Sequence, residues 1–111
     1  MRRFRNVKTC IDGIKFDSRG ESRRYLELKS LQSDGIISNL KLQVKFQIAD
    51  SCIINGKKRP ARNYVADFVY DLGGKQIVED FKGLVTPMYS LKRHLMKSVN
   101  GIDILETFDK R

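Results

Sequence analysis

The fold is decided by residues 64–83, which read Tyr-Val-Ala-Asp-Phe-Val-Tyr-Asp-Leu-Gly-Gly-Lys-Gln-Ile-Val-Glu-Asp-Phe-Lys-Gly. Two runs of β-branched and aromatic residues flank Gly73-Gly74, a pair typical of a two-residue hairpin turn. The register that follows pairs Leu72 with Lys75, Tyr70 with Ile77, Phe68 with Glu79 and Asp67 with Asp80. The sequence therefore predicts a β-hairpin that brings two carboxylates opposite each other.

The opposed carboxylates are the unusual feature of this hairpin. Cross-strand neighbours lie about 5 Å apart, and like charges placed there destabilise a sheet. A fold that accepts this cost usually holds a cation between the two acids. Lys82 follows Asp80 by two residues, so it points to the same face of the strand. Asp67, Asp80 and Lys82 together outline a metal-assisted phosphodiester site.

Other interpretations of these residues stay open at this point. Asp67 lies in a run that is apolar on both faces, where a salt bridge to Lys82 or to a neighbouring arginine would also stabilise it. Asp80 and Lys82 could form an exposed, charged strand edge. A bulge at the turn would shift the register by one residue and place Glu79 opposite Asp67. Glu79 is therefore the reserve ligand, and its default place is the opposite face, near Phe68.

Length and charge limit the class of protein. The 111 residues form one domain, 1–111, and 22 Lys and Arg against 13 Asp and Glu give a net charge of +9. This excess indicates a polyanionic partner, with nucleic acid the first candidate and an anionic membrane a distant second. No apolar run has the length of a membrane span, and the basic start lacks the apolar stretch of a signal peptide. Cys10 and Cys52 lack metal-ligand spacing, which favours reduced thiols in an intracellular protein, and we assign no catalytic role to His94.

The rest of the chain predicts an α/β domain. A hairpin over residues 7–16 turns at Asp12-Gly13, and a helix runs from 18 to about 33. A strand over 40–48 alternates apolar and polar residues, a second hairpin turns at Asn55-Gly56, and the basic segment 57–60 reads as a loop. A second helix begins at Thr86-Pro87 and ends at Asn100-Gly101, before a strand over 102–108. We expect a mixed central sheet with a helix on each side.

Helical spacing identifies the residues that each helix should bury. The first helix would bury Tyr25, Leu28 and Leu31, helped by Leu26, and the second Met88, Leu91, Leu95 and Val99. Glu21 falls three residues after Ser18, where a capping box explains it without any chemistry. It also lies one turn before Tyr25, on the helical face that points at the sheet. Both roles remain open for Glu21.

Several polar residues are further candidates. Gln43, on the polar face of the 40–48 strand, would contact the metal site or a phosphate, or would simply be solvated. The basic candidates for phosphate contacts are Lys57, Lys58, Arg59, Arg62, Lys92 and Arg93. Each of them alone is more easily explained by solvation, but the net charge requires that some meet phosphate.

Glu21, Asp67 and the string Asp80-Phe81-Lys82 together resemble the PD-(D/E)XK nuclease superfamily, whose core has the order αβββαβ. More narrowly, residues 13–18, 64–68 and 78–83 are similar to a family of small, largely uncharacterised phage-encoded proteins, sometimes described as resolvase-like. Ala66 precedes Asp67 where the superfamily's name-giving proline would stand. Many members lack that proline, so the resemblance holds.

The resemblance implies a role for each matching residue. Asp67 and Asp80 would be the metal ligands, joined by the Phe81 carbonyl and by Glu21, and Lys82 would orient the attacking water or stabilise charge. The cofactor would be Mg²⁺, with Mn²⁺ able to substitute, because hard cations prefer oxygen ligands. The implied protein is a homodimeric, metal-dependent DNA endonuclease in the cytoplasm of an infected bacterial host.

Three functions compete on this basis. The preferred one is cleavage of branched DNA, such as a Holliday junction, in phage recombination, replication or DNA processing. The second is a nuclease without branch preference. The third is a non-catalytic nucleic-acid-binding or host-interacting protein on a nuclease fold, against which the intact set of Glu21, Asp67, Asp80 and Lys82 argues.

Overall fold

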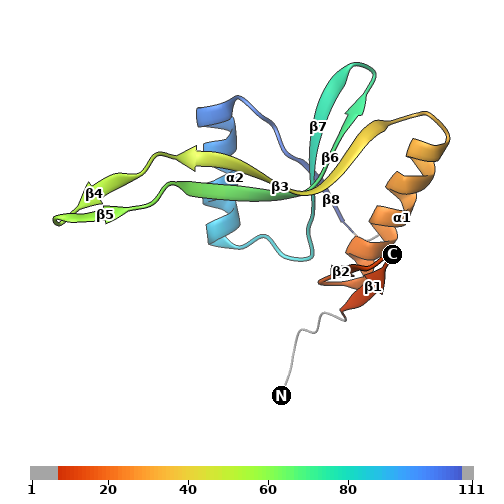
Figure 1. Ribbon diagram of the computed structural model, residues 1–111, viewed down its shortest axis with the longest axis horizontal. Coiled ribbons are helices and arrows are strands. Elements are labelled where there is room, and N and C mark those ends of the chain that lie inside the picture. Colours follow the sequence, from red (N-terminus) through yellow and green to blue (C-terminus); the bar gives the residue numbers. More distant parts are fainter. Residues whose placement is uncertain (1–7, 109–111) are drawn as a thin grey trace.

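The computed structural model describes residues 8–108, so the predicted start of the first hairpin at residue 7 lies outside this range. The elements are β1 (Thr9–Ile11), β2 (Ile14–Phe16), α1 (Arg19–Ser33), β3 (Ser38–Ala49), β4 (Cys52–Ile54), β5 (Lys57–Arg59), β6 (Arg62–Leu72), β7 (Lys75–Phe81), α2 (Pro87–Asn100) and β8 (Leu105–Thr107). Figure 1 shows α1 and α2 at opposite ends of the β3–β6 ribbon. No helix within residues 8–108 is long and apolar enough to cross a membrane.

The central sheet has the strand order β3-β6-β7-β8. The β3–β6 and β6–β7 pairs are antiparallel, whereas β8 runs parallel to β7, which confirms the predicted mixed sheet. Gly73 and Gly74 have φ of 59° and 80°, values that favour glycine and build the two-residue turn. The pairs from Leu72↔Lys75 to Phe68↔Glu79 are those predicted, so this part of the hairpin has no bulge and the alternative register is wrong. The predicted pair Asp67↔Asp80 is not formed, because the β6–β7 ladder ends at Phe68↔Glu79.

The two helices pack on opposite sides of β6. Phe68 is buried in a cluster with Tyr25 and Leu28 of α1. Its neighbour Val69 is buried in a second cluster with Met96 of α2. Because successive residues of a strand point to opposite faces, the two clusters lie on the two faces of the sheet. The prediction of a helix on each side is confirmed.

The caps of both helices follow from local sequence. The Ser18 hydroxyl accepts the Glu21 N–H at 3.2 Å, and the Thr86 hydroxyl accepts the Tyr89 N–H at 3.1 Å. Gly101 ends α2 with a φ of 70°. The helix limits predicted at these positions are therefore confirmed.

The buried stripe predicted for α2 is wrong for three of its four residues. Met88, Leu91 and Val99 are exposed, Leu95 packs partly buried against the core as predicted, and the buried residues of the helix are Tyr89 and Met96. The helix is turned by about one residue, or roughly 100°, from the expected orientation. The reason is Tyr89, whose ring is buried while its hydroxyl donates to Glu106 at 2.6 Å. On α1, Leu26 is likewise exposed rather than part of the core.

Two further segments differ from expectation. The last strand, β8, is shorter than the predicted 102–108, and Ile102 and Ile104 instead pack, partly buried, against the α2 cluster. Residues 57–60 do not form a loop: β4 and β5 make a regular two-stranded hairpin, with Asn55-Gly56 at its turn. Pro60 follows β5, so its missing N–H does not interrupt that ladder.

Candidate active site

Asp67 lies where two strands separate. The β6–β7 ladder ends at Phe68↔Glu79, while β6 continues to pair with β3 toward its beginning. In this fork, the Asp67 Oδ2 accepts the Phe81 N–H at 2.9 Å. The carboxylate thus takes over a backbone donor that the ladder would otherwise bind, which fixes its position.

Asp80 and Lys82 complete the central part of the site. Asp80 is only 4% exposed, and its Oδ2 lies 3.0 Å from the Lys82 Nζ. The same Nζ lies 3.7 Å from the centre of the Tyr89 ring, within cation–π range. The Lys82 backbone N–H donates to the Thr107 carbonyl at 2.8 Å. Lys82 is therefore held from both sides, with its charge directed at Asp80.

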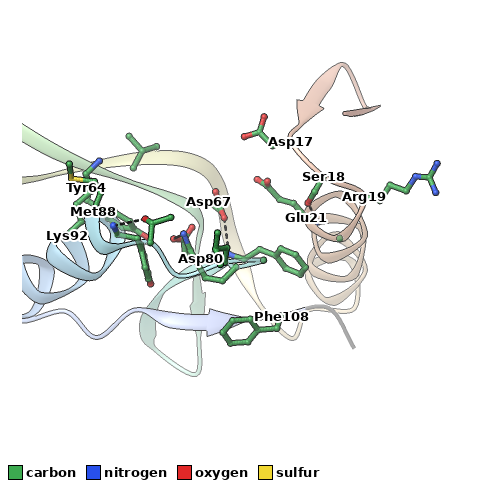
Figure 2. A pocket seen from close by; sticks show the side chains of 18 of the residues that line it. Asp17, Ser18, Arg19, Glu21, Tyr64, Asp67, Asp80, Met88, Lys92 and Phe108 are labelled. Atoms are coloured by element: carbon green, nitrogen blue, oxygen red, sulfur yellow. Dashed lines mark hydrogen bonds and ion pairs between the residues drawn. The ribbon is translucent and has the colours of Figure 1, made fainter. Parts of the chain in front are cut away.

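Glu21 approaches from the first turn of α1. It is buried, and it lines the same pocket as Asp67 and Asp80. Figure 2 shows Glu21 and Asp17 on the α1 side of the pocket, facing Asp67. The backbone of Glu21 is used by the Ser18 cap, whereas its carboxylate is turned to the pocket. The two roles that the sequence left open are compatible.

The acids Glu21, Asp67 and Asp80 have too little positive charge around them to stabilise all three in the ionised form. Burial, together with the adjacent Asp80 carboxyl and Glu21, raises the pKa of Asp67 to about 9. Burial and the charges of Asp17 and Asp80 also raise the pKa of Glu21. The neighbouring ammonium of Lys82 opposes the effect on Glu21 but does not cancel it. A divalent cation or a protonated acid would relieve this repulsion.

Two tyrosines of the pocket were not expected from the sequence. The Tyr64 hydroxyl is buried at the pocket and has no hydrogen-bond partner among residues 8–108. The ring centres of Tyr64 and Tyr89 lie 6.4 Å apart, so the two rings form one wall beside Lys82. A tyrosine in an apolar strand, like Tyr64, or in an amphipathic helix, like Tyr89, is typical of a core residue, and no spacing in the sequence distinguishes these two. Their polar ends are revealed only by the fold.

The remaining wall of the pocket is partly basic and partly apolar. Its other lining residues include Arg19, Arg23, Lys92, Leu84, Met88 and Phe108. Figure 2 shows Lys92, Met88 and Tyr64 on the side opposite Glu21. A cleft with acids at its centre and cations at its margin suits a phosphate ester that approaches a bound cation.

A protein-family model, described as "Protein of unknown function (DUF1064)", matches residues 1–103. The chain belongs to the DUF1064 family. No curated protein and no solved structure matches it. The functional argument for this DUF1064 protein therefore depends on the geometry of its own side chains.

Glu79, the reserve ligand, is not brought to the pocket. It is 0% exposed and is bound by the Arg24 Nε at 2.6 Å and Nη2 at 3.0 Å. The Tyr70 and Thr107 hydroxyls also donate to it, at 2.6 and 3.0 Å. Both oxygens of Glu79 are thus used in joining α1, β6, β7 and β8. In this DUF1064 protein, Glu79 belongs to the structure rather than to the pocket.

The other candidates are distributed over the surface. Gln43 lies across from Asp67 in the β3–β6 register, but it is exposed and does not line the pocket. Its φ of 54° is unusual for a residue within a strand. Among the basic candidates, Lys92 lines the pocket and Arg93 forms an ion pair with Glu106 at 2.8 Å. Lys57, Lys58, Arg59 and Arg62 are exposed along β5 and the start of β6.

The carboxylate oxygens of the pocket are the type of ligand that a hard divalent cation prefers. Mg²⁺ commonly takes one or two protein carboxylates and completes its shell with water and substrate phosphate. Asp67 and Asp80 offer such a pair. Within residues 8–108, however, no three His, Cys, Asp or Glu side chains are grouped so as to hold a metal ion by themselves. An ion held by Asp67 and Asp80 would complete its shell with water, substrate phosphate or a backbone carbonyl.

Proposed function

We propose that this DUF1064 protein is a metal-dependent DNA endonuclease with a PD-(D/E)XK-like core. The observation that carries the proposal is the pair of Asp67 and Asp80 in one pocket, with Lys82 3.0 Å from Asp80 and the pKa of Asp67 raised. Buried acids that repel each other are a feature of catalytic sites, because structural acids are usually neutralised. The element order α1, β3, β6, β7, α2, β8 agrees with the αβββαβ core and supports the proposal.

Each residue of the site would have a distinct task. Asp67 and Asp80 would hold Mg²⁺ or Mn²⁺, helped by Glu21 and the Phe81 carbonyl. The bound ion would supply Lewis-acid charge against the phosphate. The Phe81 N–H fixes the orientation of Asp67, and the Tyr89 ring and Asp80 fix the ammonium of Lys82. Lys82 would thereby present a positioned positive charge where negative charge develops during hydrolysis.

The substrate that we propose is branched DNA, such as a Holliday junction, cleaved by a homodimer. The net charge of +9 supports a polyanionic substrate. Met88, Leu91 and Val99 leave an apolar face of α2 exposed, which supports a second copy of the chain as partner. The setting would be phage recombination, replication or DNA processing in the cytoplasm of a bacterial host.

One observation favours a second candidate function. Four of the basic candidates, Lys57, Lys58, Arg59 and Arg62, are exposed outside the pocket, where they would contact nucleic acid without any bound metal. In that case the protein would bind nucleic acid, or a host protein, without cutting. The basic residues of β5 and the pocket margin would serve this function equally well.

Cleavage of a labelled four-way junction and of the matching linear duplex separates these functions. Each substrate is incubated with Mg²⁺, Mn²⁺ or EDTA and with wild type, Asp80→Asn or Asp103→Asn. Asp103 is an exposed aspartate outside the pocket, paired with Lys97, so it serves as the matched control. We expect Asp80→Asn to cut about 10³-fold more slowly, because an ion held by the site stabilises the transition state by several kcal/mol.

The results decide between the candidates. Metal-dependent cutting that is lost in Asp80→Asn and kept in Asp103→Asn supports the nuclease, and faster cutting of the junction supports branch selectivity. Equal rates on junction and duplex would indicate a nuclease without branch preference. Tight binding without cutting under any metal would contradict the nuclease and favour the binding protein.

A further inference from the structure

The β4–β5 hairpin is an arm that the core of the protein does not support. Every residue from 50 to 60 is exposed, including Ile53 and Ile54, and β4 and β5 form a sheet of their own. Figure 1 shows the arm continuing the β3–β6 ribbon away from both helices. A two-stranded hairpin is only marginally stable by itself in water. A partner that contacts the arm would therefore stabilise it.

The charges of the arm define that partner. Residues 51–66 contain no Asp or Glu, whereas Lys57, Lys58, Arg59 and Arg62 follow within six positions. In the register Ile54↔Lys57 and Ile53↔Lys58, Lys57 and Arg59 share one face of the ribbon and Lys58 lies on the other. Basic side chains on both faces of the ribbon can contact phosphates that lie on both sides of it. A groove of duplex DNA, bounded by two backbones, has this property, and the major groove admits a two-stranded ribbon.

The distance between the arm and the pocket suggests how the arm is used. Lys57 precedes Asp67 by ten residues along β5 and β6, which are joined by Pro60-Ala61. At about 3.3 Å per residue this is a span of up to ~33 Å. One helical turn of B-DNA is about 34 Å, or roughly 10 bp. If the cleaved phosphate of the DNA lies in the pocket, the arm would therefore reach a groove about one helical turn further along the same duplex.

We infer that the β4–β5 arm lies in the groove of the duplex that flanks the cleaved position, and that tight binding requires about one helical turn of such flank. This inference rests on the proposed function for the identity of the substrate. It adds a duplex partner for the arm and a required length. The contacts would be to phosphate, so they would not select a base sequence.

The test uses four-way junctions whose arms have 5, 8, 11 and 16 bp. The variant is Lys57→Gln/Lys58→Gln/Arg59→Gln, and the control is Lys8→Gln/Lys15→Gln/Lys75→Gln, three exposed lysines outside the arm and the pocket. Both triple variants lower the net charge by three, from +9 to +6. Affinity is measured in EDTA as a function of salt, so that no cleavage is needed, and cutting is then followed with Mg²⁺.

We expect wild-type affinity to rise with arm length up to about one turn and then to level off. The arm variant should lose at least about tenfold in affinity on the long junctions and little on the shortest. Its salt slope should fall by nearly 3, because about 0.9 counterions are released per phosphate contact. The control should keep the length dependence of the wild type. Equal losses in both variants, or the same length dependence in all three proteins, would overturn the inference.

Other outcomes separate this inference from the nuclease proposal. If the wild type cuts but the arm variant binds and cuts like it at every length, the arm inference fails and the nuclease stands. If nothing cuts but the length dependence in EDTA is lost with the arm, the nuclease fails and the arm remains a duplex-binding element. If Ile53→Thr/Ile54→Thr dissociates a dimer while DNA binding is unchanged, the occupant is a second copy and the inference is wrong.

Discussion

Glu79 and Asp80 are adjacent in the chain and equally removed from solvent, at 0% and 4% exposure, yet they lie in opposite environments. On its face of β7, Glu79 has an arginine fork and two hydroxyls around its two oxygens. On the other face, Asp80 has Lys82 and, beside it, the acids Asp67 and Glu21.

The comparison separates an acid that stabilises the fold, Glu79, from one that we propose to be functional, Asp80. A buried carboxylate is tolerated when hydrogen bonds and a counter-charge replace its hydration, as they do for Glu79. Asp80, Asp67 and Glu21 share the ammonium of Lys82 and one backbone N–H, so their compensation is incomplete and their burial has a free-energy cost that the fold must offset elsewhere. Incompletely compensated acids of this kind are concentrated at functional sites, where a substrate or cation supplies the missing charge. Burial alone would not have distinguished the two residues.

The substitution Glu79→Gln tests how much the buried Glu79 stabilises the fold, and it should have the largest effect on stability. The change leaves the Arg24 guanidinium without its counter-charge and disturbs contacts to Tyr70 and Thr107. Loss of one partner of a buried ion pair costs about 3–5 kcal/mol, and since Arg24 is partly exposed we expect about 2–3 kcal/mol here. Urea denaturation measures the free energy of unfolding. Asp80→Asn is the matched change on the other face: it loses the ion pair with Lys82 but also removes the repulsion of Asp67 and Glu21, so it should cost less than ~1 kcal/mol or stabilise the protein. Equal losses from both variants would break the comparison.

The second test uses pH in metal-free buffer. A pKa of Asp67 near 9 means that the folded protein keeps a proton which the unfolded chain releases above its ordinary pKa, about 4. Between these values the folded state binds more protons, so the free energy of unfolding falls as pH rises. We expect Tm to drop by roughly 5 °C or more from pH 5.5 to 8, and Asp67→Asn to flatten the curve.

Divalent cations should reverse this effect. At pH 8, Mg²⁺ that binds the ionised acids should raise the Tm of the wild type, because it binds only the folded state. Asp67→Asn should show a smaller increase. Parallel pH curves for wild type and variant, with no Mg²⁺ effect on either, would show that the Asp67 carboxyl is compensated in the same way as Glu79.

Local chemistry made the hairpin and its carboxylates predictable. The Gly73-Gly74 turn sets the register, and the period of two places Asp67, Asp80 and Lys82 on one face without any tertiary information. Glu21 was predicted because helical spacing puts it on the buried side of α1. These inferences use distances of a few residues, over which backbone geometry alone fixes direction.

The features that could not be predicted depend on how distant elements meet. Tyr89 replaces Met88 on the buried face of α2 because a glutamate from β8 receives its hydroxyl, and this pairing is not visible in sequence spacing. The hydrogen bonds that compensate Glu79 likewise include two from Arg24, which lies on α1, far from β7 in the sequence. The register alternative that favoured Glu79 was equally local, so only the fold could reject it. The separation of β6 from β7 at Asp67 is a property of the whole sheet.

The smallest expected effect compares two tyrosines of β6. Tyr64 and Tyr70 are each 3% exposed, but the Tyr70 hydroxyl donates to Glu79 at 2.6 Å, whereas that of Tyr64 has no hydrogen-bond partner in the described part of the chain. Tyr70→Phe removes a hydrogen bond to a charged group and should destabilise the protein by about 1.5–3 kcal/mol without slowing cleavage. Tyr64→Phe removes a buried, unsatisfied hydroxyl and should stabilise it by about 1 kcal/mol.

Activity should change in the opposite sense. If the Tyr64 hydroxyl donates to a substrate phosphate beside Asp80, Tyr64→Phe should slow Mg²⁺-dependent cutting by about tenfold while Tm rises by roughly 4–8 °C. Tyr70→Phe should lower Tm and leave the rate per folded molecule unchanged. A Tyr64→Phe variant that is both less stable and fully active would place this hydroxyl with the structural groups. If Tyr64→Phe raises Tm and also slows cleavage, the Tyr64 hydroxyl acts on the substrate. A hydroxyl with only a structural role cannot produce both changes.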